Sequence, residues 1–174
     1  IDLVDLAAGS KTDLGLLKVM EDFYLKIGKK PVVFEKFISG YVANRLQAAM
    51  GLEINKLLDE GWATPSAIDD SVKYGLALRM ALMGSLMKAD FTGLDMMQRG
   101  MANRTYDPPI PKGNSSTLDE LLESGRGGVM SGAGYFDYGG LSASELFKNR
   151  DIGLLRLKSE VAQIEVKYPL GKKT

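Results

Sequence analysis

The sequence of 174 residues contains no cysteine and no histidine. Without cysteine, the chain forms no disulfide bond and offers no thiolate nucleophile or soft metal ligand. Without histidine, it has no side chain whose ordinary pKa lies near neutrality, so a proton acceptor has to be a shifted carboxylate or lysine, or come from elsewhere. The missing histidine also excludes histidine-based metal sites and argues against a complete acid–base enzyme within these residues.

The sequence also has no excess of either charge and no long hydrophobic run. The chain has 22 lysine and arginine residues and 22 aspartate and glutamate residues. This balance gives no excess of positive charge that would favour binding to nucleic acid or to an anionic membrane surface. The longest apolar run, residues 74–87, is shorter than the ~20 residues that cross a bilayer, and it contains Arg79. We therefore expect a cytoplasmic protein that binds neither nucleic acid nor membrane.

The first 36 residues have the pattern strand–helix–strand. Residues 1–8 are partly apolar on both faces, as in a strand that is covered on two sides. Thr12 is the expected N-cap of a helix over 13–27. Residues 29–36 form the next expected strand, which is short and rich in β-branched residues. This order is typical of a parallel α/β sheet, although too few strands are present for a sheet that stands alone.

From residue 37 onward the pattern predicts helices only. An amphipathic helix over 37–61 ends at Gly61. Thr64 and Pro65 are a good N-cap and first residue for a short helix over 65–74. Residues 76–102 predict one or two further helices, with a break near one of the two glycines at positions 84 and 93.

The last third of the chain alternates loops with helices. A segment rich in proline and turn formers, 104–116, is followed by Thr117 and Glu120 at the spacing of a capping box. The segment 125–140 is a glycine-rich loop around an aromatic cluster. Ser142 and Glu145 repeat the capping-box spacing at the start of the final helix.

Three segments, in this order, resemble the carboxy-terminal portion of the 3-hydroxyacyl-CoA dehydrogenase family. They are GYVANRL at 40–46, the long segment from LLDEGW to GLD at 57–95, and GAGYFDY at 132–138. The resemblance implies a mainly α fold: a helical domain like the C-terminal domain of 6-phosphogluconate dehydrogenase, preceded by the end of a Rossmann α/β domain. It places the remnant of the NAD-binding domain at 1–36 and the substrate-binding and dimerisation domain at 37–174.

The resemblance further implies part of an NAD-dependent oxidoreductase that converts a 3-hydroxyacyl-CoA to a 3-oxoacyl-CoA. NAD would be bound mainly by upstream residues, an acyl-CoA would be the substrate, and the helical domain would form a homodimer. Neither the G-x-G-x-x-G fingerprint nor the catalytic histidine of the family occurs in the 174 residues. We therefore expect these residues to be inactive alone.

The family motifs match two candidate site residues. Asp5 stands where the family has a carboxylate that orients the catalytic histidine, although glutamate is usual there; the alternative is a strand-end aspartate that is held in a turn. Asn44 matches the asparagine that faces the substrate carbonyl, where an amide near a helix N-terminus stabilises a developing oxyanion. The alternative for Asn44 is an asparagine that caps its own helix.

Two other functions fit the same residues. One is a related dehydrogenase of a sugar acid such as L-gulonate, or of carnitine; the other is a helical dimerisation module without catalysis. Gly84-Ser85 stands where the family generally has Gly-Pro. The methionines near this position suit either an acyl-chain pocket or a core or dimer interface; they are Met80, Met83, Met87, Met96 and Met97.

Overall fold

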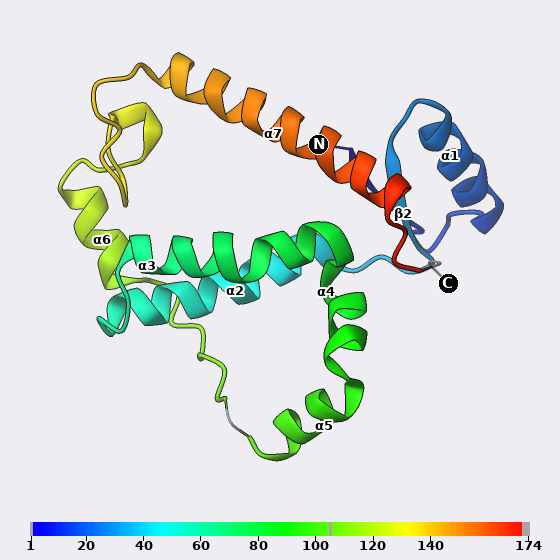
Figure 1. Ribbon diagram of the computed structural model, residues 1–174, viewed down its shortest axis with the longest axis horizontal. Helices are drawn as coiled ribbons and strands as arrows, with labels where there is room; N and C mark the ends of the chain where they lie inside the picture. Colours follow the sequence, from blue (N-terminus) through cyan, green and yellow to red (C-terminus); the bar gives the residue numbers. More distant parts are fainter. Residues whose placement is uncertain (1, 105, 172–174) are drawn as a thin grey trace. The chain divides into compact units, whose positions relative to one another are not determined.

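The computed structural model describes residues 2–104 and 106–171 (Figure 1). Ile1 and Thr105, which fall in the expected first strand and the expected proline-rich loop, lie outside the described residues. The chain forms two compact units, one up to Gly51 and the other from Leu52 onward. The expected domain boundary after residue 36 stays a prediction.

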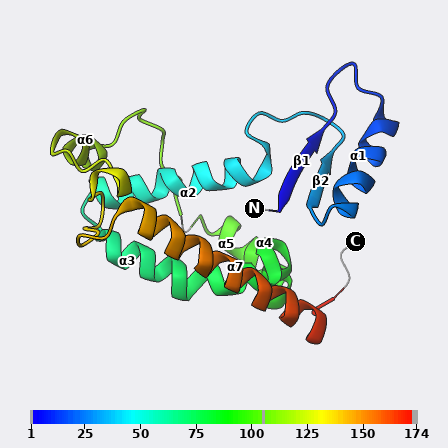
Figure 2. The same cartoon turned by 90° about the horizontal axis from the view of Figure 1, so that it is seen from above.

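The N-terminal unit contains the expected strand–helix–strand. Strands β1 (Leu3–Ala7) and β2 (Lys30–Phe34) pair in parallel, with Asp5 opposite Val32. Helix α1 (Leu14–Lys26) connects them and packs beside the two-stranded sheet (Figure 2). Leu17 of α1 and Ala8, which follows β1, are buried. The prediction of a parallel pair joined by a helix is confirmed.

The N-cap of α1 differs from the expected residue. The Asp13 carboxylate accepts a hydrogen bond of 2.8 Å from the backbone N–H of Gly15, so Asp13 is the cap. The hydroxyl of Thr12 instead accepts from the backbone N–H of Gly9 over 3.0 Å and closes the turn after β1. The Thr12 prediction is wrong because two good capping residues are adjacent and the turn takes the first of them.

Helix α2 (Tyr41–Asp59) begins four residues later than the sequence pattern predicts. Gly40 and Tyr41 have positive φ angles of 79° and 48°, which no residue inside a right-handed helix adopts. The helix is followed by Gly61 with a φ of 68°, as expected for a helix that ends in a left-handed glycine. None of the α2 residues is buried, although their apolar spacing is helical.

The next helical segment is continuous over two kinds of helix. Helix α3 (Pro65–Asp70) leads into the π-helix η1 (Ser71–Ala77), and this leads into α4 (Leu78–Thr92). The hydroxyl of Thr64 accepts from the backbone N–H of Ala67 over 3.2 Å, so the expected N-cap is confirmed. The sequence did not predict the π-helix, because its apolar spacing differs little from that of an α-helix.

The sequence predicted a break near Gly84 or Gly93, and the backbone leaves the helical conformation at both glycines. Gly84 has φ and ψ angles of 71° and −168°, and the chain bends there within α4 (Figure 1). Gly93 has a φ of 101° and separates α4 from α5 (Leu94–Ala102). These backbone conformations are open to glycine and costly for other residues, so the two glycines determine where the helices bend.

Two helices and a short 3₁₀ turn complete the chain: α6 (Ser116–Glu123), η2 (Val129–Ser131) and α7 (Ala143–Lys167). Ser115 caps α6, so the capping box expected from Thr117 and Glu120 is wrong. The capping box of Ser142 and Glu145 is confirmed in both of its hydrogen bonds. Helix α7 contacts α4 and η2.

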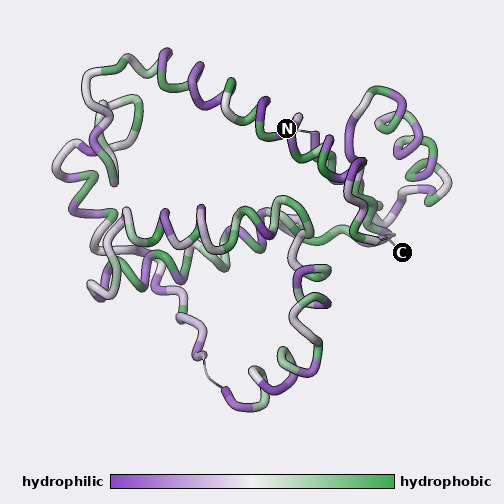
Figure 3. Tube along the Cα trace, viewed as in Figure 1, coloured by the Kyte–Doolittle hydropathy of each residue, from purple (hydrophilic) through white to green (hydrophobic). Residues whose placement is uncertain are grey.

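Few side chains are buried in either unit. The buried apolar residues are Ala8, Leu17, Ile68 and Ala89. Green hydrophobic and purple hydrophilic positions alternate along α7 (Figure 3), where Leu155 is 65% exposed and Val166 is 84% exposed. Among the described residues, no helix combines the length and the apolar character that membrane crossing requires. The fold is a mainly helical one with a small parallel sheet near its start, as expected.

Candidate functional site

Asp5 is the middle residue of β1 and is half-buried. Its backbone pairs with Val32 in the parallel ladder, so Asp5 belongs to a regular strand and not to a turn at the strand end. Its carboxylate forms no ion pair or hydrogen bond with another described side chain. The role of Asp5 in orienting a catalytic histidine stays a prediction.

Asn44 is the fourth residue of α2, and its side chain is exposed. The amide forms no hydrogen bond with a described residue, so Asn44 does not cap its own helix. The capping alternative is therefore wrong, and the amide is available to a ligand. The proposed contact with a substrate oxygen stays a prediction.

The turn at the start of α2 fixes where Asn44 lies in the helix. Tyr41 has a left-handed backbone conformation, which is uncommon for a residue other than glycine. Its ring contacts Phe34 at 6.1 Å and Phe37 at 5.8 Å between ring centroids. The backbone N–H of Tyr41 donates to the carbonyl of Ile38 over 3.0 Å. Aromatic packing and this turn hold a strained residue three positions before the candidate asparagine, a feature that often accompanies functional sites.

Asp5 and Asn44 both belong to the N-terminal unit, but no hydrogen bond joins their side chains. A pair that acts on one substrate does not require direct contact, since the expected histidine would lie between Asp5 and the reacting oxygen. The described residues therefore offer two separate polar groups for chemistry, not an assembled catalytic centre.

The start of α1 does not fit the pyrophosphate of NAD. A dinucleotide is usually held by a glycine-rich turn at the N-terminus of the helix after the first strand. In the helix that follows β1 here, the carboxylate of Asp13 accepts from the backbone N–H of Gly15 and places a negative charge at this N-terminus. An anion is therefore disfavoured at α1, and the start of this helix is not a pyrophosphate site.

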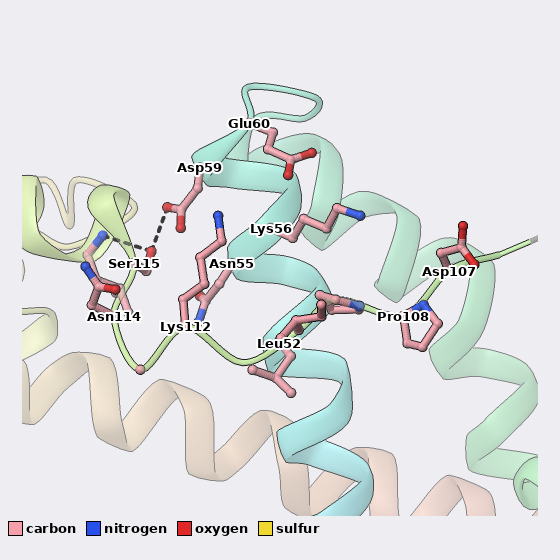
Figure 4. Close-up of a pocket in the computed structure, with 14 residues that line it drawn as sticks. Leu52, Asn55, Lys56, Asp59, Glu60, Asp107, Pro108, Lys112, Asn114 and Ser115 are labelled. Carbon is pink, nitrogen blue, oxygen red and sulfur yellow. Dashed lines mark hydrogen bonds between the residues drawn. The ribbon is translucent and has the colours of Figure 1, made fainter.

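A cavity of about 470 Å³ lies between the C-terminal half of α2 and the segment 107–115 (Figure 4). None of the residues expected from the sequence lines it. Its polar lining includes Asn55, Lys56, Asp59, Asp107, Lys112 and Asn114. Asp59 accepts hydrogen bonds from the Ser115 hydroxyl at 2.7 Å and from the Thr117 backbone N–H at 2.9 Å.

These two hydrogen bonds stabilise the charged form of Asp59. Donation from the backbone N–H of Thr117, and then from the Ser115 hydroxyl, lowers the pKa of Asp59 from 3.8 to about 2. A carboxylate with so low a pKa is a poor proton acceptor near neutral pH. Asp59 therefore fastens the start of α6 to the end of α2 and is not a candidate for a general base.

The motif at 132–138 lies in a tight loop near Asp59. Burial, and then the negative charge of Asp59, raise the pKa of Tyr135 above its ordinary value. The Arg126 side chain donates to the carbonyl of Gly134 over 2.9 Å. Gly134 is buried, and a Cβ atom added to it would lie 3.0 Å from the Cα atom of Gly128. The glycine at position 134 of the family motif therefore lets the backbone pass close to the backbone at Gly128.

A smaller cavity of about 260 Å³ lies among η1, α4 and α5. Met80 and Met97 line it, together with Arg79, Ser85 and Lys88. Met80 is 41% exposed and Met97 is 47% exposed, so the two methionines are not buried core residues in the described structure. Among the residues 2–104 and 106–171, no group of three or more acidic, histidine or cysteine side chains is placed to hold a metal ion.

The structure reveals these cavities, whereas the sequence pointed only to Asp5 and Asn44. Asp59 and Ser115 are 56 positions apart, and no local spacing connects them. The only signal in the sequence was the family segment 57–95, which contains both Asp59 and Arg79 without distinguishing them from their neighbours.

Comparison with known proteins identifies the relatives of this chain. The family model described as "3-hydroxyacyl-CoA dehydrogenase, C-terminal domain" matches residues 40–138. An L-carnitine dehydrogenase from Pseudomonas sp is 27% identical over 177 residues, which cover 97% of this chain and 52% of that protein. The chain thus spans about half the length of the curated relatives that it matches.

Two solved structures are similar to this chain. One is a 5-formyl-3-hydroxy-2-methylpyridine 4-carboxylic acid 5-dehydrogenase, described as an NAD⁺-dependent dismutase. It has a TM-score of 0.79 and 25% identity, and the match covers 95% of this chain and 52% of that one. The other is a 3-hydroxyacyl-CoA dehydrogenase from Archaeoglobus fulgidus, with a TM-score of 0.53, 26% identity and coverage of 94% and 55%.

Proposed function

Because the chain belongs to the 3-hydroxyacyl-CoA dehydrogenase C-terminal domain family, we propose that it forms the substrate-side part of an NAD-dependent dehydrogenase. The whole protein oxidises a secondary alcohol to a ketone, and NAD is bound mainly by residues outside the 174. The support for this division is the length of the relatives and the charge of Asp13 at the start of α1. The residues of this chain bind and position the alcohol.

The preferred substrate is a small hydroxy acid of the carnitine type and not an acyl-CoA. The observation that carries this choice is the match to L-carnitine dehydrogenases from several bacteria, together with the higher TM-score for the pyridine 4-carboxylate dehydrogenase. This reverses the order that the sequence motifs suggested. A sugar acid such as L-gulonate belongs to the same class of substrate.

A 3-hydroxyacyl-CoA remains the second candidate. The name of the matching family and the two methionines of the smaller cavity favour it, since flexible thioether side chains adapt to an acyl chain. The two candidates differ in the acyl group that lies one carbon away from the reacting carbon: a free carboxylate in one and a thioester in the other.

Asn44 is the catalytic residue of this chain in the proposed reaction. Its exposed amide has no partner among the described residues, and it follows the strained turn at Tyr41. An amide N–H that donates to the substrate oxygen stabilises the partial charge on that oxygen as the ketone forms or is reduced. Asp5 is a positioning residue, which holds the histidine of the whole protein in one tautomer.

A homodimer is the proposed assembly. The helices α2, α5, α6 and α7 have no buried residue in the described structure, and α7 exposes apolar side chains on its surface. Exposed apolar surface of this extent is typical of an interface. Sedimentation equilibrium of the full-length protein should give twice the mass of one chain, and a monomer at micromolar concentration would contradict the assembly.

Steady-state turnover by the full-length protein tests the function. We expect reduction of NAD⁺ with L-carnitine or L-gulonate, and at most weak oxidation of NADH with acetoacetyl-CoA. Activity with acetoacetyl-CoA alone would establish the second candidate. The absence of turnover with all three compounds would contradict the assignment as a dehydrogenase of either type. The 174 residues alone are expected to be inactive.

A further inference from the structure

We propose that the cavity among η1, α4 and α5 binds the carboxylate of a small organic acid, with Arg79 and Lys88 as its cationic partners. The inference rests on the proposed function and adds to it the residues that select a free acid. The cavity volume of about 260 Å³ lies just below the range for small-molecule sites, roughly 300–1,000 Å³. A small hydroxy acid fits such a volume, whereas a whole CoA thioester does not.

The charge of the lining favours an anion. Two cationic side chains, those of Arg79 and Lys88, line the cavity, and no acidic residue does so. Neither cation forms an ion pair with a described carboxylate. Other cationic side chains of the helices do form exposed ion pairs. Arg99, for example, lies 3.4 Å from the carboxylate of Asp95. Arg79 and Lys88 form no such pair with a described residue.

The π-helix positions the arginine. The Nε–H group of Arg79 donates to the carbonyl oxygen of Gly75 over 2.8 Å. In an α-helix that carbonyl would bond the backbone N–H of Arg79, but the wider π-helical turn η1 shifts the backbone partners by one residue. One edge of the guanidinium is thereby fixed, and its two terminal amino groups have no described partner. A planar pair of N–H donors matches the two oxygens of a carboxylate.

The remaining lining suits a short organic acid. Leu76, Met80 and Met97 add apolar side chains to the lining, and Ala89, which is 6% exposed, belongs to the α4 part of it. Ser85 adds a hydroxyl that has no described hydrogen-bond partner, directly after the bend at Gly84. Because the related family generally has proline at the position of Ser85, this hydroxyl is a polar group that a proline would not supply.

The test compares an acid with its neutral amide in the full-length protein. L-carnitine and carnitinamide differ only in the carboxylate. We expect Arg79→Met to raise the KM and the Kd for L-carnitine about tenfold to a hundredfold, the effect of losing a charged hydrogen bond. The constants for carnitinamide should change little, and kcat for L-carnitine should change less than KM. Lys88→Met should also raise the KM and Kd for L-carnitine, by a smaller factor, and should change the constants for carnitinamide little.

Matched variants separate binding from folding. Arg79→Lys keeps the charge but loses the planar fork, so it should lie between the native protein and Arg79→Met. Arg99→Met removes an exposed arginine of α5 outside the cavity and should leave both ligands unaffected. Equal losses for the acid and the amide in Arg79→Met, or no loss for either, would overturn the carboxylate site.

Direct binding distinguishes this inference from the proposed function. If the protein turns over none of the compounds, calorimetric titration with L-carnitine and with 3-hydroxybutyrate still decides the matter. Saturable binding that Arg79→Met weakens and Arg99→Met does not would support the anion site although the dehydrogenase assignment had failed. The absence of saturable binding of either acid to the native protein would overturn the site.

Discussion

The hydroxyl of Ser115 donates a hydrogen bond of 2.7 Å to the carboxylate of Asp59, which is 56 positions earlier in the chain. The same carboxylate oxygen accepts from the backbone N–H of Thr117 over 2.9 Å. Ser115 is also the N-cap of α6 and is only 3% exposed. One serine therefore begins a helix and fastens it to the end of another.

Asp59→Asn should destabilise the protein at neutral pH, and the deficit should shrink in acid. The folded-state pKa of Asp59 is lowered from 3.8 to about 2, because Thr117 and Ser115 donate to the charged form. A lowered pKa means that the contribution to stability is complete above about pH 4 and is lost as the pH falls toward about 2. Urea unfolding midpoints of both proteins across this range measure the effect.

Glu123→Gln is the matched control for Asp59→Asn, since Glu123 is an exposed acid of α6 without a described hydrogen bond. Its midpoint should follow that of the native protein at every pH. Ser115→Ala should cost about 1 kcal/mol through the lost cap, together with the lost bond to Asp59. A pH-independent deficit in Asp59→Asn would show that the carboxylate contributes by its shape and not by its charge.

Local signals in the sequence predicted local structure well. The Thr64 cap and the Ser142–Glu145 capping box were predicted correctly, because each hydrogen bond joins residues three positions apart. The expected caps at Thr12 and Thr117 failed for one reason. Each has another good capping residue within two positions, and the surrounding turn determines which of them is used.

Contacts between distant residues were beyond the sequence pattern. The family motifs point to Asn44 but give no indication of Asp59, whose partners Ser115 and Thr117 are brought near only by the fold. In the sequence, Arg79 is only a charge that interrupts an apolar run. Its place in the smaller cavity depends on the π-helix, and apolar spacing does not distinguish a π-helix from an α-helix.

Gly134→Ala should destabilise the protein by about 1–3 kcal/mol, because the new methyl group would lie 3.0 Å from the Cα atom of Gly128 and backbone would have to shift. Gly153→Ala is the control: it lies in α7 and has open space around the added atom, so it should be neutral or stabilise by up to about 1 kcal/mol. Thermal unfolding of the three proteins measures both effects. Equal stability of Gly134→Ala and the native protein would show that the crossing of Gly128 and Gly134 is loose.

Asp5→Asn should lower kcat of the full-length enzyme by about 10²-fold while the KM changes little, because the histidine would lose the carboxylate that fixes its tautomer. The positioning role also predicts that the acid limb of the kcat/KM profile moves to lower pH, since a nearby carboxylate raises the pKa of an imidazole. Asp5→Glu keeps the carboxylate that the family usually has at this position and should retain most of the activity. Full activity of Asp5→Asn with an unchanged pH profile would leave Asp5 as an ordinary strand residue.

Asn44→Ala should lower kcat of the full-length enzyme by about 10²–10³-fold, which is the scale of losing one donor to a developing oxyanion. Because the amide of Asn44 forms no hydrogen bond with a described residue, the variant should unfold at the same temperature as the native protein. Gln47→Ala, one turn further along the exposed surface of α2, removes another amide and should leave kcat unchanged. Asn44→Asp replaces the donor by a negative charge, so it should be at least as inactive as Asn44→Ala. A kcat within about twofold of native in Asn44→Ala would mean that the substrate oxygen is stabilised by another group, since one lost oxyanion donor costs far more than that.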